Sequence, residues 1–180
     1  EGDFWGAPTV TSYAVGTTPA SSDNLMVSEI MYHPLEPSEV EIAAGHEDQD
    51  LFEFIEFVNI SDSAIDMSGV TFGAGANFTF PGGYQLAAGA RVIVVSDLAA
   101  FRIRYGSDLD GFIIGQFQND TKLSNSGERI LILGVDGSPI REFTYNDKSP
   151  WPEAADGDGF SLVINSPNSA PDHNLPENWS

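Results

Sequence analysis

The sequence predicts an all-β domain, either a sandwich or a barrel, and two observations carry this prediction. Aromatic residues make up 11% of the 180-residue chain, with 12 Phe against 3 Met, while Gly and Pro number 18 and 11. Aromatic and β-branched residues favour strands, and frequent turn formers separate one strand from the next. Strand-like runs also recur at intervals of roughly 8 to 15 residues with turn signals between them, which is the spacing of a sandwich or barrel.

The first two predicted strands are LMVSEIMYH (25–33) and LFEFIEFVN (51–59), joined by an acidic loop. Side chains alternate between the two faces of a strand, so Glu53 lies on one face of the second strand and Glu56 on the other. Apolar residues fill the remaining positions of both faces. We therefore expect a strand whose middle is buried on both sides.

Shorter elements follow. GVTF and NFTFP predict two short strands separated by GAGA, and RVIVVSD (91–97) is a continuous apolar run typical of a central strand. SDLAAFRIRYG then predicts the one short helix of the domain. Ser96 or Asp97 can cap its N-terminus, and Gly106 stops it.

The remaining predicted strands are FIIGQF, ERILILG, IREFTY and finally GFSLVIN (159–165). The Asp136-Gly137 pair favours a hairpin turn between ERILILG and IREFTY. No repeat of 20 to 50 residues is visible, which excludes solenoids and propellers.

Both ends of the chain are expected to lie outside the core. Residues 1–24 are rich in Gly, Pro, Ser and Thr without periodicity, and we interpret them as a linker or an edge extension. Residues 166–180 have the same composition and predict a C-terminal linker. The folded domain is thus expected over residues 25–165, as a module of a longer polypeptide.

The charge and composition exclude several functions. Formal net charge is −20, and no Lys or Arg precedes Arg91. Binding to a phosphate backbone depends on several Lys or Arg contacts, so nucleic acid is excluded as a partner. No apolar run approaches the roughly 20 residues that cross a bilayer, so membrane insertion is excluded too. Without cysteine the chain has no disulfide, no thiolate nucleophile and no cysteine-based zinc site.

Five sequence blocks in a fixed order carry a family resemblance: VSEIMYHP, FEFIEFVNISDSAIDMSGVTF, FTFPGGYQLAAGARVIVV, LSNSGERILILGVDG and YNDKSPWPEAADGDGFSL. In these blocks the chain resembles the lamin tail domain, and in particular its bacterial relatives in large exported proteins. The resemblance implies an immunoglobulin-like β-sandwich, to which the residues add the one short helix and the extended termini.

The same resemblance implies a function. It indicates a non-catalytic structural or interaction module of an exported or cell-surface bacterial protein, located outside the cell. Its partners would be protein, glycan or neighbouring domains of the same polypeptide. DNA binding of the lamin kind does not carry over, because the chain lacks the basic residues that it needs.

No catalytic residue is predicted. His33, His46 and His173 lie in separate predicted loops at no motif spacing, and no G-x-S-x-G, H-E-x-x-H, P-loop or dinucleotide fingerprint is present. We therefore expect that the chain is not an enzyme. A hydrolase that acts through a carboxylate pair is a distant alternative for the function, ranked third after an interaction module and a carbohydrate-binding module.

Calcium is the cofactor that the acidic loops HEDQDLFE (46–53) and EAADGDG (153–159) would suit, because Ca²⁺ takes six to eight oxygen ligands. Neither loop follows the EF-hand pattern, and acidic surfaces and Asp-Gly turns also occur without any ion. The candidate ligands are Asp156, Asp158, Asp48, Asp50 and Glu53, with Glu29 and Glu56 as possible partners on neighbouring strands.

Two aromatic residues are candidates for ligand binding. Trp151, between Pro150 and Pro152, and Tyr145 lie in a predicted loop, where a ring could stack on a sugar. The competing interpretation is that the Trp packs on the edge of the sandwich. If the rings bind sugar, the alternative function is a calcium-dependent carbohydrate-binding module attached to a hydrolase.

Overall fold

The computed structural model describes residues 17–180, and the predictions for residues 1–16 lie outside the described residues. The five-stranded sheet contains, in spatial order, β11 (Leu162–Val163), β2 (Leu25–Met31), β3 (Phe54–Asn59), β7 (Arg91–Val95) and β8 (Ile113–Gln116). The three-stranded sheet contains β10 (Pro139–Thr144), β9 (Arg129–Leu133) and β5 (Thr71–Ala74). A further small sheet contains β1 (Thr18–Pro19), β4 (Ile65–Asp66) and β6 (Gln85–Leu86).

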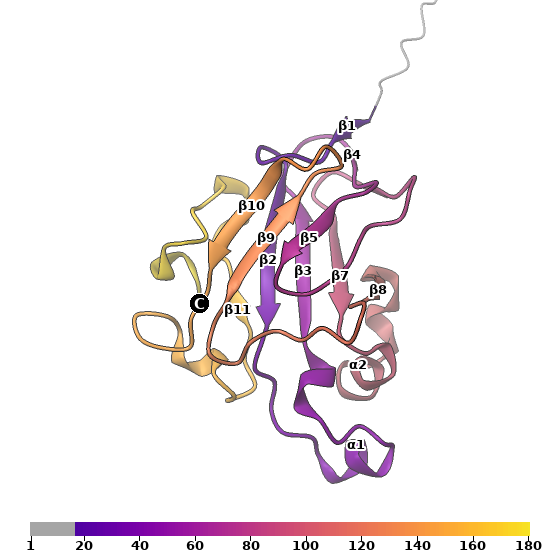
Figure 1. Cartoon of the computed structure of the whole chain (residues 1–180), viewed down its shortest axis with the longest axis vertical. Coiled ribbons are helices and arrows are strands. Elements are labelled where there is room, and N and C mark those ends of the chain that lie inside the picture. The colour runs from indigo at the N-terminus through magenta and orange to yellow at the C-terminus, as the bar shows by residue number, and fades with distance from the viewer. Residues whose placement is uncertain (1–16) are drawn as a thin grey trace, which may run out of the picture.

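The two larger sheets face each other, and the small sheet lies at one end of the sandwich (Figure 1). The residues between them form one hydrophobic core, which includes Ile55 and Phe57 of β3 and Ile130 and Ile132 of β9. Phe57 also packs edge-on against Phe72 of β5, with ring centroids 5.8 Å apart. This arrangement confirms the predicted all-β sandwich.

Strand β3 is buried on both faces, as the sequence predicts, and all six of its residues are buried. Ile55 and Phe57 point into the sandwich core. Phe54 belongs to a second cluster with Phe101, on the face of the five-stranded sheet turned away from the three-stranded sheet. We call this second face the outer face.

Helix α2 (Leu98–Tyr105) covers part of the outer face and confirms the predicted helix. The Asp97 side chain accepts a hydrogen bond of 2.8 Å from the Ala100 amide and so caps the N-terminus. Gly106 ends the helix with φ of 86°, a left-handed conformation that glycine adopts without strain.

A second helix was not predicted. Helix α1 (Glu39–Ala43) lies in the segment interpreted as an acidic loop, at the end of the molecule opposite β1 (Figure 1). Ser38 and Glu41 form a reciprocal capping box at its N-terminus. Five short 3₁₀ helices complete the described chain: η1 (Gln49–Phe52), η2 (Ser107–Phe112), η3 (Glu153–Ala155), η4 (Pro167–Ser169) and η5 (Pro176–Asn178).

The C-terminal segment differs from the linker predicted over residues 166–180. Trp179 and His173 are buried, and Ser180 exchanges two backbone hydrogen bonds of 2.9 and 3.0 Å with Val163. The packed domain therefore extends beyond residue 165. The buried side chains and the two backbone hydrogen bonds attach this segment to the sandwich, although its composition is that of a loop. At the other end, Thr18–Pro19 pairs in parallel with β4, so part of the segment predicted as a linker or edge extension is attached to the domain.

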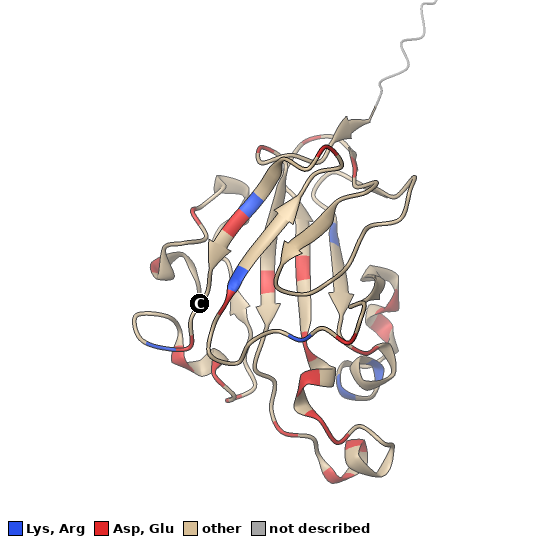
Figure 2. Cartoon of the chain, viewed as in Figure 1, with Lys and Arg blue, Asp and Glu red and all other residues tan. Residues whose placement is uncertain are grey.

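Acidic residues are spread over the loops and helices, whereas basic residues are few (Figure 2). In the same view, each of the neighbouring strands β2 and β3 carries one acidic segment. No helix among residues 17–180 is long and apolar enough to cross a bilayer.

Candidate functional site

A groove of about 400 Å³ lies on the outer face, between α2 and the segment 159–161 that leads into β11. Three strands, α2, η2 and this segment supply its walls. The lining residues are Glu29, Met31, Phe54, Glu56, Ile93, Phe101, Tyr105, Leu109, Gly159, Phe160 and Ser161.

The pairing of β2 with β3 brings together the side chains that form the floor of the groove. Glu29 of β2 pairs with Glu56 of β3, and Met31 pairs with Phe54 in the same ladder. Residues two apart on a strand share a face, so these four side chains stand together on the outer face. Because Phe101 of α2 packs against the apolar pair, the helix covers that part of the floor and leaves the two glutamates at the open part.

An aromatic wall borders the groove on the side of α2. The ring of Phe54 meets those of Phe101 and Tyr105 edge-on, with centroids 5.7 Å apart in both cases. Phe101 and Tyr105 lie 4.6 Å apart. Each of the three rings therefore packs against the two others, and together they form one wall.

The opposite wall exposes apolar surface. Phe160 is 65% exposed, and a smaller hollow of about 210 Å³ continues past Tyr105 and Gly159 to Leu35, which is 52% exposed. Solvent-exposed Phe and Leu side chains beside one hollowed surface are a feature of interaction sites. The groove therefore offers apolar contact on both sides.

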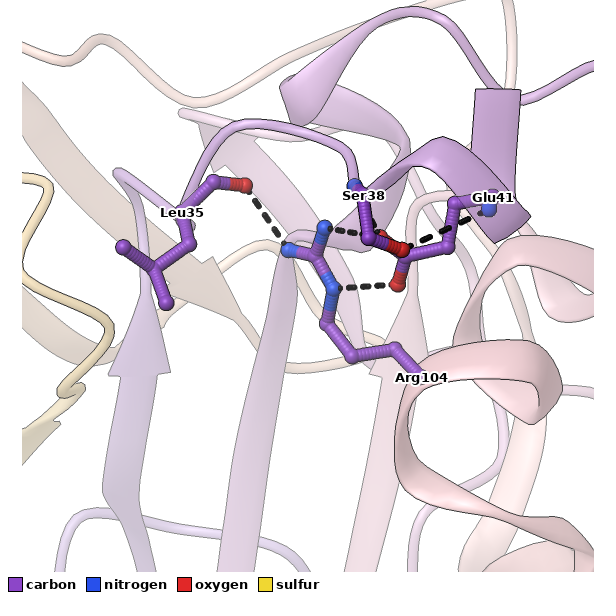
Figure 3. A network of polar contacts seen from close by, with 4 residues as sticks. All are labelled: Leu35, Ser38, Glu41 and Arg104. Atoms are coloured by element: carbon purple, nitrogen blue, oxygen red, sulfur yellow. Dashed lines mark hydrogen bonds and ion pairs between the residues drawn. The ribbon is translucent and has the colours of Figure 1, made fainter. Parts of the chain in front are cut away.

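Arg104 anchors α2 beside this hollow (Figure 3). It donates two hydrogen bonds of 2.8 and 3.0 Å to the carboxylate of Glu41 on α1, and a third of 2.9 Å to the carbonyl of Leu35. The Glu41 carboxylate also accepts hydrogen bonds from the amide and hydroxyl of Ser38. These contacts fix the two helices against the loop that precedes β3.

The two groove glutamates have different partners. Glu56 forms an ion pair with Arg91 of β7 and accepts a hydrogen bond of 2.6 Å from the hydroxyl of Ser28. Glu29 accepts a hydrogen bond of 2.5 Å from the hydroxyl of Ser161 and forms no ion pair with any residue of the described part. Burial, and after it the nearby charge of Glu56, raises the pKa of Glu29 above its ordinary value. One carboxylate of the pair therefore lacks a cation.

Of the acids predicted to bind calcium, Asp48, Asp50, Asp156 and Asp158 are not among the residues that line this groove. Lys122 donates hydrogen bonds of 2.5 and 2.9 Å to Asp48 and Asp50, while Asp156 contacts His33 at 2.7 Å and Asp158 is exposed. Within residues 17–180, no three acidic or histidine side chains are arranged to hold a metal ion. Calcium binding by the acidic loops stays a prediction from the sequence.

Glu53, also a predicted calcium ligand, is fully buried. Its Oε2 accepts a hydrogen bond of 2.9 Å from the Leu123 amide, whereas Oε1 meets no hydrogen-bond partner among the described residues. Burial is the main cause that raises the pKa of Glu53 to about 9. A carboxyl group that keeps its proton at neutral pH is a poor ligand for a cation.

The predicted sugar-binding aromatics are buried. Tyr145 is fully buried and donates a hydrogen bond of 2.8 Å to the carbonyl of Ser124. Trp151 is 8% exposed and packs near Trp179, with ring centroids 6.1 Å apart. Neither ring offers a face to a sugar, and the Trp packs on the sandwich as the competing interpretation holds.

Sequence reasoning found only part of this groove. It named Glu29 and Glu56 as neighbours across two strands, but as metal ligands, and it did not single out Tyr105 or Phe160 as site residues. The alternation of LMVSEIM and FEFIEF gives the face on which the glutamates lie. Nothing local in GFSLV indicates that its Phe faces α2.

A known family model matches most of the chain that forms this architecture. The family model described as Lamin Tail Domain matches residues 18–147, which is more than half of the chain. A search of curated proteins finds no match. The matched range contains both helices and every strand except β11, and it ends before the groove wall at 159–161.

Proposed function

This chain belongs to the lamin tail domain family, a non-catalytic immunoglobulin-like family, and from that premise we propose that it is an interaction module that binds a segment of another protein. The observation that carries the proposal is the groove on the outer face. Its volume of about 400 Å³ lies within the size range of ligand sites, which is roughly 300 to 1,000 Å³.

The surroundings of the groove support a protein ligand. Phe160 in the groove and Leu35 in the adjoining hollow present exposed apolar surface, and such patches on soluble domains commonly mark interaction sites. The rings of Phe54 and Phe101 pack against Tyr105, which supports binding of a partner without prior ordering of this side chain.

The proposal includes the location of the module. We propose that it works outside the cell, as part of a larger bacterial polypeptide. The support is the resemblance of the sequence blocks to relatives in exported proteins. Fractionation of the source bacterium, with an antibody against this domain, tests the location separately from the binding site.

A display experiment tests the binding site. A phage library of random 12-residue peptides is selected on the immobilised domain, and enriched peptides are then measured against Phe160→Ala. We expect enriched peptides whose binding to this variant is about ten-fold weaker, because a solvent-exposed ring at the groove is lost. Val135→Ala is the matched control, since Val135 is exposed on the β9–β10 turn away from the groove.

Two outcomes would overturn the proposal. One is a library from which no peptide is enriched. The other is a set of enriched peptides that bind wild-type protein, Phe160→Ala and Val135→Ala equally. Melting curves of both variants check the fold, and neither substitution removes a buried side chain.

A further inference from the structure

We infer that the groove recognises a lysine side chain of the partner, with its ammonium group at Glu29 and its methylene chain against the rings of Tyr105 and Phe160. The inference rests on the proposed function and deepens it, because it names the chemistry that the bound segment must carry. Three features of the groove support it: an unpaired carboxylate, aromatic surface around that carboxylate, and a net charge that selects a basic partner.

The carboxylates leave one negative charge without a counterion. Glu29 and Glu56 are direct neighbours across β2 and β3, and Arg91 pairs with Glu56. Oε1 of Glu29 accepts the hydrogen bond from the hydroxyl of Ser161, whereas Oε2 accepts none from any residue between 17 and 180. A partner ammonium group would supply a charged donor to this oxygen, and such charge-assisted hydrogen bonds are about twice as strong as neutral ones.

The aromatic residues suit the rest of a lysine side chain. Two of the rings that line the groove are accessible to a ligand: Phe160 is 65% exposed and Tyr105 is half-buried, whereas Phe54 and Phe101 are buried. Cations are attracted to the faces of aromatic rings, and the methylene stem of a lysine packs along apolar surface while its head stays at the polar end. Apolar residues beside the lysine would then contact Phe160 and Leu35, whose side chains are exposed.

The charge of the chain argues against a second copy as the partner. Two copies would each carry a net charge of −20 and repel each other. Five of the 7 Lys and Arg residues already form ion pairs within the chain: Arg91, Arg102, Arg104, Lys122 and Arg129. A basic segment of a different protein fits the groove better, because attraction by the acidic surface adds to the local contact.

A set of three labelled peptides tests the inference. The first is a fluorescein-labelled nonapeptide with one central lysine flanked by leucines and glycines. In the second the lysine is acetylated, which keeps the length of the side chain and removes its charge. The third carries arginine at the same position. Binding is measured by fluorescence anisotropy, and amide shifts in NMR spectra of the ¹⁵N-labelled domain locate the site.

We expect the lysine peptide to bind at the groove and the acetylated peptide to bind at least ten-fold more weakly. Glu29→Gln should lower the affinity for the lysine peptide by roughly ten-fold and leave that for the acetylated peptide unchanged. Glu142→Gln is the control for net charge, because it removes the same charge from an exposed position on β10, where Glu142 pairs with Arg129 and does not line the groove. Its affinity for the lysine peptide should equal that of wild-type protein.

The inference would be overturned by equal binding of the lysine and acetylated peptides, by equal losses in Glu29→Gln and Glu142→Gln, or by a preference for arginine. Absence of lysine-peptide binding at the groove would overturn it as well. Enriched library peptides that need Phe160 but contain no lysine would overturn the lysine inference alone, and the proposed interaction module would be retained. A library without groove binders would overturn both.

Discussion

Arg104 of α2 holds Glu41 of α1 through two parallel hydrogen bonds of 2.8 and 3.0 Å, although 63 positions separate them in the sequence. The guanidinium group also lies over the ring of Phe52, 3.4 Å from its centroid. The hydrogen bonds from Arg104 are the main cause that lowers the pKa of Glu41 to about 2. One side chain thereby ties α1, α2 and η1 together at the end of the sheet that leads to the groove.

Replacing Arg104 by lysine should destabilise the domain by about 2 kcal/mol, because lysine keeps the charge but loses the planar fork that binds Glu41 at two points. Arg102→Lys is the control, since Arg102 makes the same two-point contact with Asp110 in an exposed position on the same helix. Exposed pairs contribute about 0 to 1 kcal/mol. Urea unfolding measures the free energy of unfolding of both variants. Equal decreases in Arg104→Lys and Arg102→Lys would show that burial of the Arg104–Glu41 pair adds nothing to stability.

Glu53 should make the stability of the domain fall as pH rises. Its pKa is about 9 in the folded protein and 4.5 in an ordinary setting, so between these values the folded state binds a proton that the unfolded chain does not. The free energy of unfolding therefore decreases with rising pH from about 4.5 to about 9, and the stabilising effect of this group is fully present below 4.5.

Glu53→Gln removes this dependence, because a glutamine has the shape of the protonated acid and cannot ionise. We expect the variant to be more stable than wild-type protein at pH 9 by at least about 2 kcal/mol, and the two to converge towards pH 5. The measurement is urea unfolding at several pH values, compared with Glu142→Gln, which changes an exposed carboxylate. Parallel curves for wild-type protein and Glu53→Gln would mean that Glu53 is ionised in the fold.

Lys122 should make the loop that contains Asp48 and Asp50 insensitive to calcium. Its ammonium group contacts both carboxylates, and its hydrogen bond is the main cause that lowers the pKa of Asp48. Adding 5 mM CaCl₂ to EDTA-treated protein should shift the melting temperature by less than about 1 °C, whereas Lys122→Ala frees two carboxylates and should gain a measurable shift. MgCl₂ at equal ionic strength controls for screening. A rise of several degrees in wild-type protein would show that the acidic loops hold calcium, as the sequence predicts.

Local sequence signals are sufficient to predict the strands and helices that carry a clear alternation or capping residues. The strand around Glu56 is predictable with burial on both faces because alternation is readable in six consecutive residues, and α2 is predictable because Asp97 and Gly106 mark its ends. Helix α1 was missed because its five residues are too short to show a helical period. The box between Ser38 and Glu41 was the available signal.

The groove depends on contacts that no local pattern contains. Alternation places Glu29 and Glu56 on defined faces of their strands, but the pairing of Arg91 with only one of them follows from the order of β2, β3 and β7 in the sheet. Phe160 lines the same groove as Glu29 and Glu56, although it lies more than a hundred positions after both in the sequence. Chemistry that arises from strand order cannot be derived from composition or spacing.

The C-terminal segment should contribute to stability through Trp179, which sequence composition placed in a linker. The indole N–H donates a hydrogen bond of 2.9 Å to the carbonyl of His173, and the side chain is 4% exposed, near Phe143. Trp179→Ala should cost about 3 to 4 kcal/mol in urea unfolding, because it removes a large buried ring and leaves a cavity. Leu175→Ala, in the same segment, removes a side chain that is 44% exposed and should cost less than about 1 kcal/mol.

Comparison of Trp179→Ala with Leu175→Ala shows whether residues 166–180 are part of the folded domain or a linker. If residues 166–180 were a linker, both substitutions would leave the unfolding midpoint of the core unchanged, and the near-ultraviolet circular dichroism of the aromatic residues would be the same in each variant. If the segment is part of the fold, Trp179→Ala also releases Val163 and Ser180 from the two backbone hydrogen bonds that close the edge of β11. Faster hydrogen exchange at the Val163 amide in that variant, with unchanged exchange in Leu175→Ala, would then locate the loss at this edge.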